Sequence, residues 1–169
     1  MKILRWVLPV ALVYGAFAYG QSGVESFKGK KMPAFSATTF AGKKISNETL
    51  KGKPYILDFW ATWCGPCKAA SPTMEKIHKK FAGKGLIVIG ANVLEGSASG
   101  VAEAKKYPKM HGYTYTFTSN NDKLGEKLGI QGIPCFIFVN KSGKIIAVRT
   151  GFDSSASPAE FENIAKGLL

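Results

Sequence analysis

The sequence predicts an α/β domain with a central mixed β-sheet flanked by helices. Two nearly continuous apolar runs, residues 55–60 and 86–93, have the length and composition of strands covered on both faces. Residues 66–82 lie between them and repeat apolar side chains at helical spacing, and this strand-helix-strand order predicts parallel pairing with a right-handed crossover. Two later apolar runs flank the turn sequence of residues 140–143, which predicts an antiparallel hairpin.

Weaker patterns predict the remaining elements. Residues 35–45 form two short strand-like stretches around Gly42 and predict an N-terminal β-hairpin extension. Residues 97–109 predict a helix that ends at Pro108, because a proline interrupts helical hydrogen bonding. The other expected elements are a short extended piece at 113–117, a short helix at 121–128 closed by Gly129, and a C-terminal helix at 158–169.

Three segments are expected along the chain: a leader at residues 1–20, a flexible linker at 21–32 and the folded domain at 33–169. The leader has Lys2 and Arg5 ahead of an apolar run that ends in small residues, as in a secretory signal. A helix of roughly 14 apolar residues spans about 21 Å, less than a hydrocarbon core of about 30 Å. We expect a periplasmic or other extracytoplasmic protein whose leader is cleaved or kept as a membrane anchor. A buried helix of a cytosolic protein is the alternative.

The charge of the chain is strongly basic, with 23 Lys and Arg against 11 Asp and Glu and a formal net charge of +12. Such a balance invites a nucleic-acid or membrane-surface function. The lysines, however, occur as scattered doublets without an arginine-rich stripe or a run of stacking aromatics, so we expect a solvated basic surface and no nucleic-acid partner. Attraction to acidic proteins or anionic lipid heads stays open. Three cysteines are too few for a disulfide scaffold and point to chemistry.

Two of these cysteines, Cys64 and Cys67, lie where the first apolar strand gives way to the helix. Cysteines three apart at a helix start can share one face, with a Cα separation of roughly 5.5 Å that suits a disulfide. The first helical turn also presents unpaired N–H groups and the positive end of the helix dipole, which favour a thiolate at Cys64. We therefore predict Cys64 as the nucleophile and Cys67 as the resolving thiol of a reversible disulfide.

The run from Leu57 to Cys67, with the sequence LDFWATWCGPC, resembles the active-site signature of thioredoxins. Together with the export signal, it makes the chain similar to the secreted thioredoxin-like thiol-disulfide oxidoreductases, the TlpA/ResA-like branch that includes cytochrome c maturation reductases. The resemblance implies a thioredoxin-like fold and no cofactor or metal. It also implies substrate proteins that carry disulfides, and a membrane thiol carrier as the electron donor.

The same resemblance implies roles for two acidic residues. Asp58 matches the buried aspartate of the thioredoxin motif, which has its pKa raised by desolvation and passes protons to and from the second cysteine. A solvated carboxylate at a strand end is the alternative. Glu95 follows Asn92-Val93-Leu94 much as a glutamate near the cysteines does in the secreted branch, although an exposed glutamate at a helix start fits equally well.

Two short segments are expected to contact substrate. In thioredoxin-like proteins the proline that matches Pro134 is cis, and the loop that carries it pairs with the substrate backbone beside the dithiol. The resemblance therefore implies that Ile133 and Pro134 bind substrate, together with Trp63, Gly65 and Pro66 around the cysteines. Dedicated haem-maturation proteins carry a second glutamate just after this proline. It has no counterpart here, which weakens a cytochrome-specific function.

The third cysteine, Cys135, stands where a threonine commonly follows this proline in the family. As a small apolar residue at the start of a core strand it would be inert. As a thiol close to Cys64 it would trap a mixed disulfide, tune the redox potential or complete a soft-metal site. Slow alkylation of Cys135 in the reduced native protein would favour the inert role.

Two other functions compete with thiol-disulfide exchange. A peroxiredoxin-like peroxidase is suggested by the front hairpin and the Lys51-Gly52-Lys53 sequence, but its Thr-x-x-Cys spacing is missing because Pro66 lies three places after Trp63. A soft-metal carrier, for copper above all, would use Cys64 and Cys67, with Cys135 or His111 as a further ligand.

Overall fold

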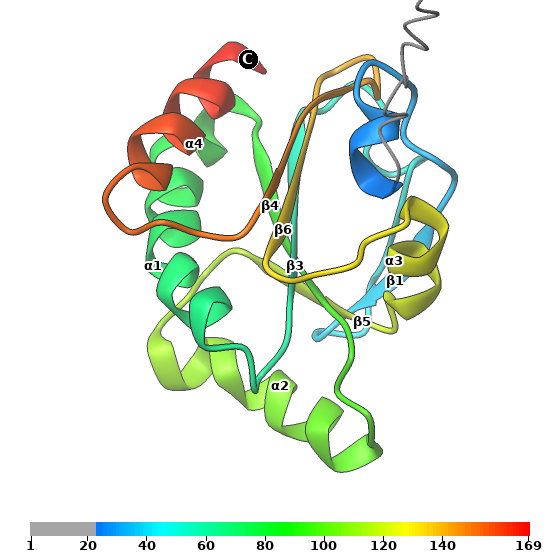
Figure 1. The fold of residues 1–169 in the computed structure, drawn as a ribbon, viewed down its shortest axis with the longest axis vertical. Coiled ribbons are helices and arrows are strands. Elements are labelled where there is room, and N and C mark those ends of the chain that lie inside the picture. Colours follow the sequence, from blue (N-terminus) through cyan, green and yellow to red (C-terminus); the bar gives the residue numbers. More distant parts are fainter. Residues whose placement is uncertain (1–22) are drawn as a thin grey trace, which may run out of the picture.

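The computed structural model describes residues 23–169, so the predicted leader and its cleavage lie outside the described residues. In chain order the elements are η1 (Gly23–Phe27), β1 (Ser36–Thr39), β2 (Lys44–Ser46), β3 (Tyr55–Trp60), α1 (Gly65–Phe81), η2 (Ala82–Lys84), β4 (Ile87–Asn92), α2 (Ala98–His111), β5 (Thr116–Ser119), α3 (Asp122–Leu128), β6 (Cys135–Val139), β7 (Ile145–Thr150) and α4 (Ser157–Gly167) (Figure 1). None of the helices between Gly23 and Leu169 combines the length and the apolar character that crossing a membrane requires.

The strands form one mixed sheet of seven strands in the order β2-β1-β5-β4-β3-β6-β7. β3 pairs in parallel with β4, to which α1 connects it, and β4 pairs in parallel with β5, to which α2 connects it. β6 pairs antiparallel with β3 and with β7. The N-terminal hairpin of β1 and β2 adds to the other edge through antiparallel pairing of β1 with β5. The predicted α/β class, mixed sheet and both hairpins are thus confirmed.

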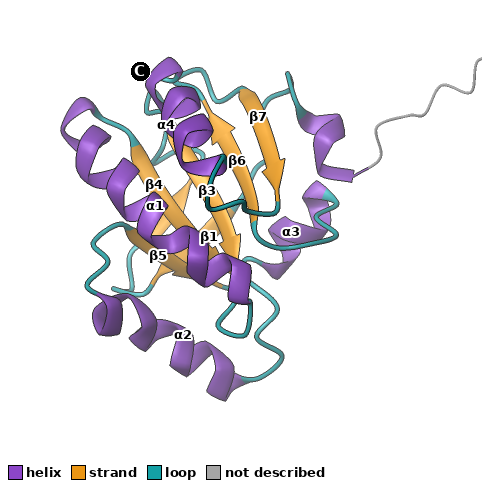
Figure 2. Ribbon diagram, turned by 60° about the vertical axis from the view of Figure 1, so that its left-hand side comes forward, coloured by secondary structure: helices purple, strands orange, loops and turns teal. Residues whose placement is uncertain are grey.

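Helices cover the two faces of the sheet. Figure 1 looks along the sheet, with α1 and α4 on one side and α3 on the other, and Figure 2 shows α1 and α4 in front of the strands. The first face packs side chains of β3 and β6 against α1, α2 and α4, including Ile56, Trp60, Met74, Tyr107, Phe136 and Phe161. The second packs the alternate strand residues against η1 and α3, including Leu57, Phe59, Ile137, Val24, Leu124 and Leu128. Every residue of β3 is buried, because this strand is covered on both faces.

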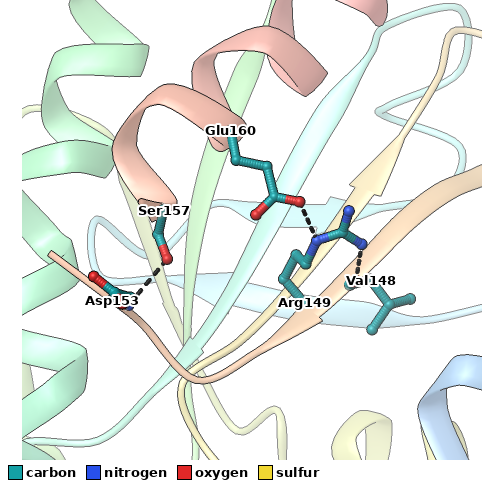
Figure 3. A network of polar contacts seen from close by, with 5 residues as sticks. All are labelled: Val148, Arg149, Asp153, Ser157 and Glu160. Atoms are coloured by element: carbon teal, nitrogen blue, oxygen red, sulfur yellow. Dashed lines mark hydrogen bonds and ion pairs between the residues drawn. The ribbon is translucent and has the colours of Figure 1, made fainter. Parts of the chain in front are cut away.

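Figure 3 shows how α4 is fixed against the end of β7. The Arg149 guanidinium of β7 donates to Glu160 of α4 at 2.5 Å and to the Val148 carbonyl at 2.7 Å. Where the chain turns into the helix, the Asp153 amide donates to the Ser157 hydroxyl at 3.0 Å. These contacts join the start of α4 to β7 and to the turn that follows it.

α2 differs from its prediction at the C-terminal end. Pro108 was expected to terminate it, yet the helix continues to His111 and ends at Gly112, whose φ of 69° is left-handed. A proline lacks the N–H that would donate within the helix, but its carbonyl can still accept, and the left-handed glycine closes the turn that follows. The Tyr113 amide still donates to the Pro108 carbonyl at 2.9 Å.

The prediction of a flexible linker is wrong for residues 23–32. Val24 and Met32 are buried, and a bridge joins Lys31 to Lys144 beside β7. The Gly29 amide donates to the Ile145 carbonyl at 2.8 Å, and the Met32 amide donates to the Gly143 carbonyl at 2.8 Å. The polar, glycine-containing sequence looks like a linker because this segment is held mainly by backbone hydrogen bonds. Such bonds need no periodic pattern of apolar side chains, so the sequence does not show them.

Candidate active site

Cys64 and Cys67 form a disulfide with a Cα–Cα distance of 5.3 Å. Cys64 is the N-cap residue of α1, and the Cys67 amide at the third helical position donates to the Cys64 sulfur at 3.2 Å. Cys64 keeps 4% of its surface exposed and Cys67 none. The sulfur of Cys64 therefore receives a backbone N–H at the positive end of the helix, which is the environment that stabilises a thiolate.

Asp58 is buried in the middle of β3, between Gly90 of β4 and Phe136 of β6. Side chains alternate along a strand, so Asp58 shares its face with Ile56 and Trp60, and this is the face on which Cys64 and Cys67 lie. Neither carboxylate oxygen has a hydrogen-bond partner among the described residues. Burial without compensation raises the pKa of Asp58 to about 8, so the group is largely protonated at neutral pH.

Glu95 contacts the dithiol loop, by which we mean residues 61–64 between β3 and α1. The Thr62 amide donates to one Glu95 oxygen at 2.8 Å, and the Thr62 hydroxyl donates to the other at 2.6 Å. The Asn92 side-chain amide donates to Glu95 at 2.6 Å and to the Trp60 carbonyl at 3.4 Å. The structure therefore brings Glu95 to the loop that carries Cys64, where it holds Thr62 in place.

The residues around the cysteines expose the surface that a partner would meet. Trp63 is 61% exposed, and its indole N–H donates to the Leu94 carbonyl at 2.8 Å. Gly65 and Pro66 are exposed between the two cysteines. Leu94 is itself 55% exposed. An apolar surface thus lies directly beside Cys64.

Ile133 and Pro134 precede β6, and the peptide bond between them is cis. Ile133 is half-buried and packs against the same core cluster that holds Cys64 and Cys67. Pro134 is buried, and its carbonyl accepts from the Gly151 amide at 2.8 Å, which ties the loop to the end of β7. This loop lies at the same end of the sheet as the dithiol, since the start of β6 pairs with the end of β3.

Cys135 and His111 do not join the dithiol. Cys135 pairs with Phe59, so its fully buried side chain belongs to the opposite face of the sheet, and burial raises its pKa to about 12. His111 stacks on Tyr113 with ring centroids 5.7 Å apart. Within residues 23–169 no three His, Cys, Asp or Glu side chains gather in a geometry that could hold a metal ion.

The sequence did not reveal four residues that shape this site. Thr62 and Asn92 bind Glu95, and Leu94 accepts from Trp63. The Leu94 amide in turn donates to Asp122, the first residue of α3, at 2.8 Å. Asn92 and Leu94 lie within three residues of Glu95, so the sequence already places them near it, whereas Asp122 lies 28 residues from Leu94 and no sequence pattern links the two.

Comparisons with known proteins agree with this geometry. The thiol-disulfide oxidoreductase ResA of Bacillus subtilis (strain 168) is 29% identical over 162 residues, which are 95% of this chain and 88% of the relative. The thiol:disulfide interchange protein DsbE of Pseudomonas fluorescens biotype C is 33% identical over 119 residues, 69% of this chain and 63% of the relative.

Solved structures show the same fold. A thiol:disulfide interchange protein of the thioredoxin family from Chlorobium tepidum TLS aligns with a TM-score of 0.66 and 31% identity, over 82% of this chain and 94% of that one. The fold is therefore thioredoxin-like. The model of the Redoxin family matches residues 27–168, which include the disulfide, the cis-proline loop and every strand of the sheet. The chain belongs to the Redoxin family.

Proposed function

We propose that this thiol-disulfide oxidoreductase reduces disulfide bonds of partner proteins outside the cytoplasm. The observation that supports the proposal most directly is the placement of Cys64 at the N-cap of α1, with Cys67 buried one turn further along. An N-capping sulfur is activated by the helix terminus, while a buried second sulfur is protected until the first has reacted.

In the reduced enzyme, the Cys64 thiolate attacks one sulfur of the substrate disulfide. The substrate S–S bond breaks, one substrate sulfur leaves as a thiolate that takes up a proton, and a mixed disulfide forms with Cys64. Cys67 then loses its proton and attacks the Cys64 sulfur. The mixed disulfide breaks, the second substrate thiol is released, and the Cys64–Cys67 disulfide forms, so that two electrons pass to the substrate.

Asp58 is the proposed acceptor for the proton of Cys67. Its carboxyl group has a pKa raised to about 8 by burial and lies on the face of the sheet where the cysteines pack. A group that titrates near neutral pH can both take and return a proton during turnover. The absence of a hydrogen-bond partner among the described residues leaves both oxygens free for that exchange.

The substrate is proposed to lie between the dithiol and the Ile133–Pro134 loop. Trp63, Gly65 and Pro66 are exposed around Cys64 and would form one side, and the half-buried Ile133, which precedes the buried cis-Pro134, would form the other. Backbone pairing with the Ile133–Pro134 loop would align the substrate disulfide without selecting a particular side chain, as β-augmentation does elsewhere.

The direction of electron flow and the location rest on the sequence. Gly65 and Pro66 form the Gly-Pro dipeptide of reducing thioredoxins, for which the reduction potential is about −270 mV. Residues 1–20 have the features of a secretory leader or membrane anchor. A reductase in an oxidising compartment needs a source of electrons, so we propose a membrane thiol carrier as the donor. Apocytochromes with oxidised haem-attachment cysteines are one substrate class to test.

The test is the reduction potential of the Cys64–Cys67 couple, together with trapping of partners by a Cys67→Ser variant. We expect a potential nearer −270 mV than the roughly −120 mV of strong periplasmic oxidants, and mixed disulfides through Cys64. A potential close to −120 mV would reverse the proposed direction. Identical numbers of free thiols in protein purified under air and under reductant would rule out thiol-disulfide exchange as the function.

A further inference from the structure

Two exposed apolar side chains, Trp63 and Leu94, form a ledge beside Cys64. Trp63 is 61% exposed and Leu94 55%, and both are among the few large apolar side chains that the described residues expose. The hydrogen bond from the Trp63 indole to the Leu94 carbonyl, at 2.8 Å, joins the two. In the apolar ledge of Trp63 and Leu94, the position of the Trp63 ring is thus tied to the backbone of Leu94.

The backbone of Leu94 is held in an unusual conformation. Its φ of 58° lies in the left-handed region, which a bulky side chain seldom occupies. A residue in this region persists only when its surroundings impose the conformation. Among residues 23–169 the Leu94 amide donates to the Asp122 carboxylate at 2.8 Å, and this bond ties the strained backbone to α3.

Asp122 is in turn fixed by a buried polar network at the start of α3. The neighbouring Asn121 donates to the Asn92 carbonyl at 3.0 Å and to the Thr118 carbonyl at 3.2 Å. Thr118 has no exposed surface, and Asn121 is 2% exposed. Asn121 thus contacts Asn92 and its neighbour Asp122 contacts Leu94, so the two residues hold both ends of the Asn92–Leu94 segment. Because Asn121 is buried and fixed by hydrogen bonds, it determines where the exposed Asp122 lies.

We infer that Asp122 is a positioning residue for substrate recognition: by holding Leu94 in its left-handed conformation, it places the Trp63–Leu94 ledge to receive an apolar side chain next to the substrate disulfide. We expect an apolar side chain as the ligand because Trp63 and Leu94 expose apolar surface, while the amide and carbonyl of Leu94 already form hydrogen bonds within the protein. The inference rests on the proposed reduction of protein disulfides. It adds Asp122, which lies 58 positions after Cys64 in the sequence, to the residues that determine substrate binding.

The experiment compares Asp122→Ala, Asp122→Asn and, as a matched control from an exposed carboxylate of the same helix, Glu126→Ala. Three readouts are followed: hydrogen exchange of the Trp63 indole N–H by NMR, KM and kcat for reduction of insulin with dithiothreitol as donor, and the rate with the small disulfide 5,5′-dithiobis(2-nitrobenzoate). For Asp122→Ala we expect faster indole exchange and a KM for insulin raised about threefold to tenfold, the change that corresponds to one net hydrogen bond. We expect kcat and the small-disulfide rate to change by less than about twofold, since the small probe does not need the ledge.

Asp122→Asn retains a side-chain oxygen that can accept from the Leu94 amide, so it is expected to restore both the indole protection and the KM. Glu126→Ala should match the unaltered protein. Leu94→Ala gives a second, independent measurement on an exposed side chain: KM should rise while indole exchange stays slow, because the backbone contact survives and the apolar surface does not.

Several results would overturn the inference. Unchanged indole exchange and KM in Asp122→Ala would show that Asp122 does not position the ledge. An equal fall of kcat and the small-disulfide rate, with KM unchanged, would show general loosening of the dithiol loop. An unchanged KM in Leu94→Ala would show that the ledge does not contact the substrate. This result would overturn the inference even if Asp122→Ala fails to fold. Failure of the unaltered protein to reduce insulin faster than dithiothreitol alone would instead count against the proposed function.

Discussion

Asp58 lies in the centre of the sheet with a carboxyl group that no donor of the described residues contacts. Burial raises its pKa to about 8 from an ordinary value near 3.8. Between these two values the folded protein holds a proton that the unfolded chain releases. The free energy of unfolding must therefore fall as the pH rises through this window, by up to about 1.4 kcal/mol per pH unit.

Replacing Asp58 with Asn removes this titration and keeps the shape of the side chain. We expect Asp58→Asn to be more stable than the unaltered protein by about 4 kcal/mol at about pH 7, with the difference growing from about pH 4 to about pH 8. Urea unfolding of the oxidised protein at several pH values measures this directly. The exposed carboxylate variant Glu126→Gln serves as control, and parallel stability curves for Asp58→Asn and the unaltered protein would contradict the raised pKa.

Cys135 illustrates how burial makes a thiol inert. Its side chain has no exposed surface, its pKa is raised to about 12, and its nearest polar contact is the Thr150 hydroxyl at 4.0 Å. At about pH 8 only about one thiol in ten thousand is then ionised. Iodoacetamide added to the reduced native protein should modify Cys64 and leave Cys135 unlabelled, as measured by mass spectrometry.

The same reagent in urea should modify all three cysteines, which shows that Cys135 is chemically competent once exposed. Labelling of native Cys135 at a rate similar to that of Cys64 would mean that this part of β6 opens to solvent. It would also revive the role of Cys135 as an auxiliary thiol.

At the scale of elements, the loop after β4 holds the dithiol loop in position. Val93 donates to the Trp60 carbonyl at 3.0 Å, and Glu95 accepts twice from Thr62, so that pairing between β3 and β4 continues beyond the sheet. Glu95→Ala would leave the Thr62 amide without its acceptor and the Asn92 side-chain amide with the Trp60 carbonyl alone, at 3.4 Å. We expect the free energy of unfolding to fall by about 2 kcal/mol, as for loss of hydrogen bonds to a charged group.

Because this contact supports the loop that carries Cys64, the Glu95→Ala variant should also lose activity with insulin and with a small disulfide alike, by about tenfold. Glu103→Ala is the matched control, since Glu103 is exposed and pairs only with Lys106 at 2.6 Å. Stability and activity equal to those of Glu103→Ala would contradict a supporting role for Glu95. Glu95→Gln keeps one accepting oxygen, so its stability and activity should lie between those of Glu95→Ala and Glu103→Ala.

Elements with a strong local signal could be predicted from the sequence. β3 and β4 are continuous apolar runs, α3 ends at a glycine with a φ of 67°, and the β6–β7 turn contains Gly143 with a φ of 75°. Where composition and structure disagreed, the deciding contacts were distant for one segment. Residues 23–32 are ordered by hydrogen bonds to and beside β7 that no local pattern encodes, whereas α2 continues past Pro108 and ends locally, at Gly112.

At the scale of the whole molecule, the sequence predicted which residues lie near the dithiol when a motif carried them. Cys64 and Cys67 form a disulfide, Asp58 is buried and the peptide bond before Pro134 is cis, whereas the roles that the resemblance implies for these residues stay predictions. Asp122 could not be predicted, because its contact with Leu94 depends on how α3 is placed by the buried Asn121. Long-range placement of a polar side chain leaves no mark on composition, spacing or periodicity.

The N-terminal segment of residues 23–32 gives a test of the molecule as a whole. It covers the outer edge of β7, where the Ile145 amide donates to the Lys30 carbonyl at 2.9 Å, and it buries Val24 and Met32. Deletion of residues 1–31 should therefore lower the free energy of unfolding by about 3 kcal/mol, the order expected for exposing apolar side chains of this size. The uncovered edge should also promote aggregation.

Deletion of residues 1–22 is the matched control and should leave the stability of the domain unchanged. Activity per folded molecule should be similar in both truncated proteins, because these contacts lie at the end of β7 opposite to its pairing with Cys135 near the dithiol. Val24→Ala in the full chain should show part of the loss, about 1–2 kcal/mol. Urea unfolding and light scattering measure these effects. Equal stability of the two truncated proteins would show that residues 23–31 are a linker after all, and that β7 tolerates an open edge.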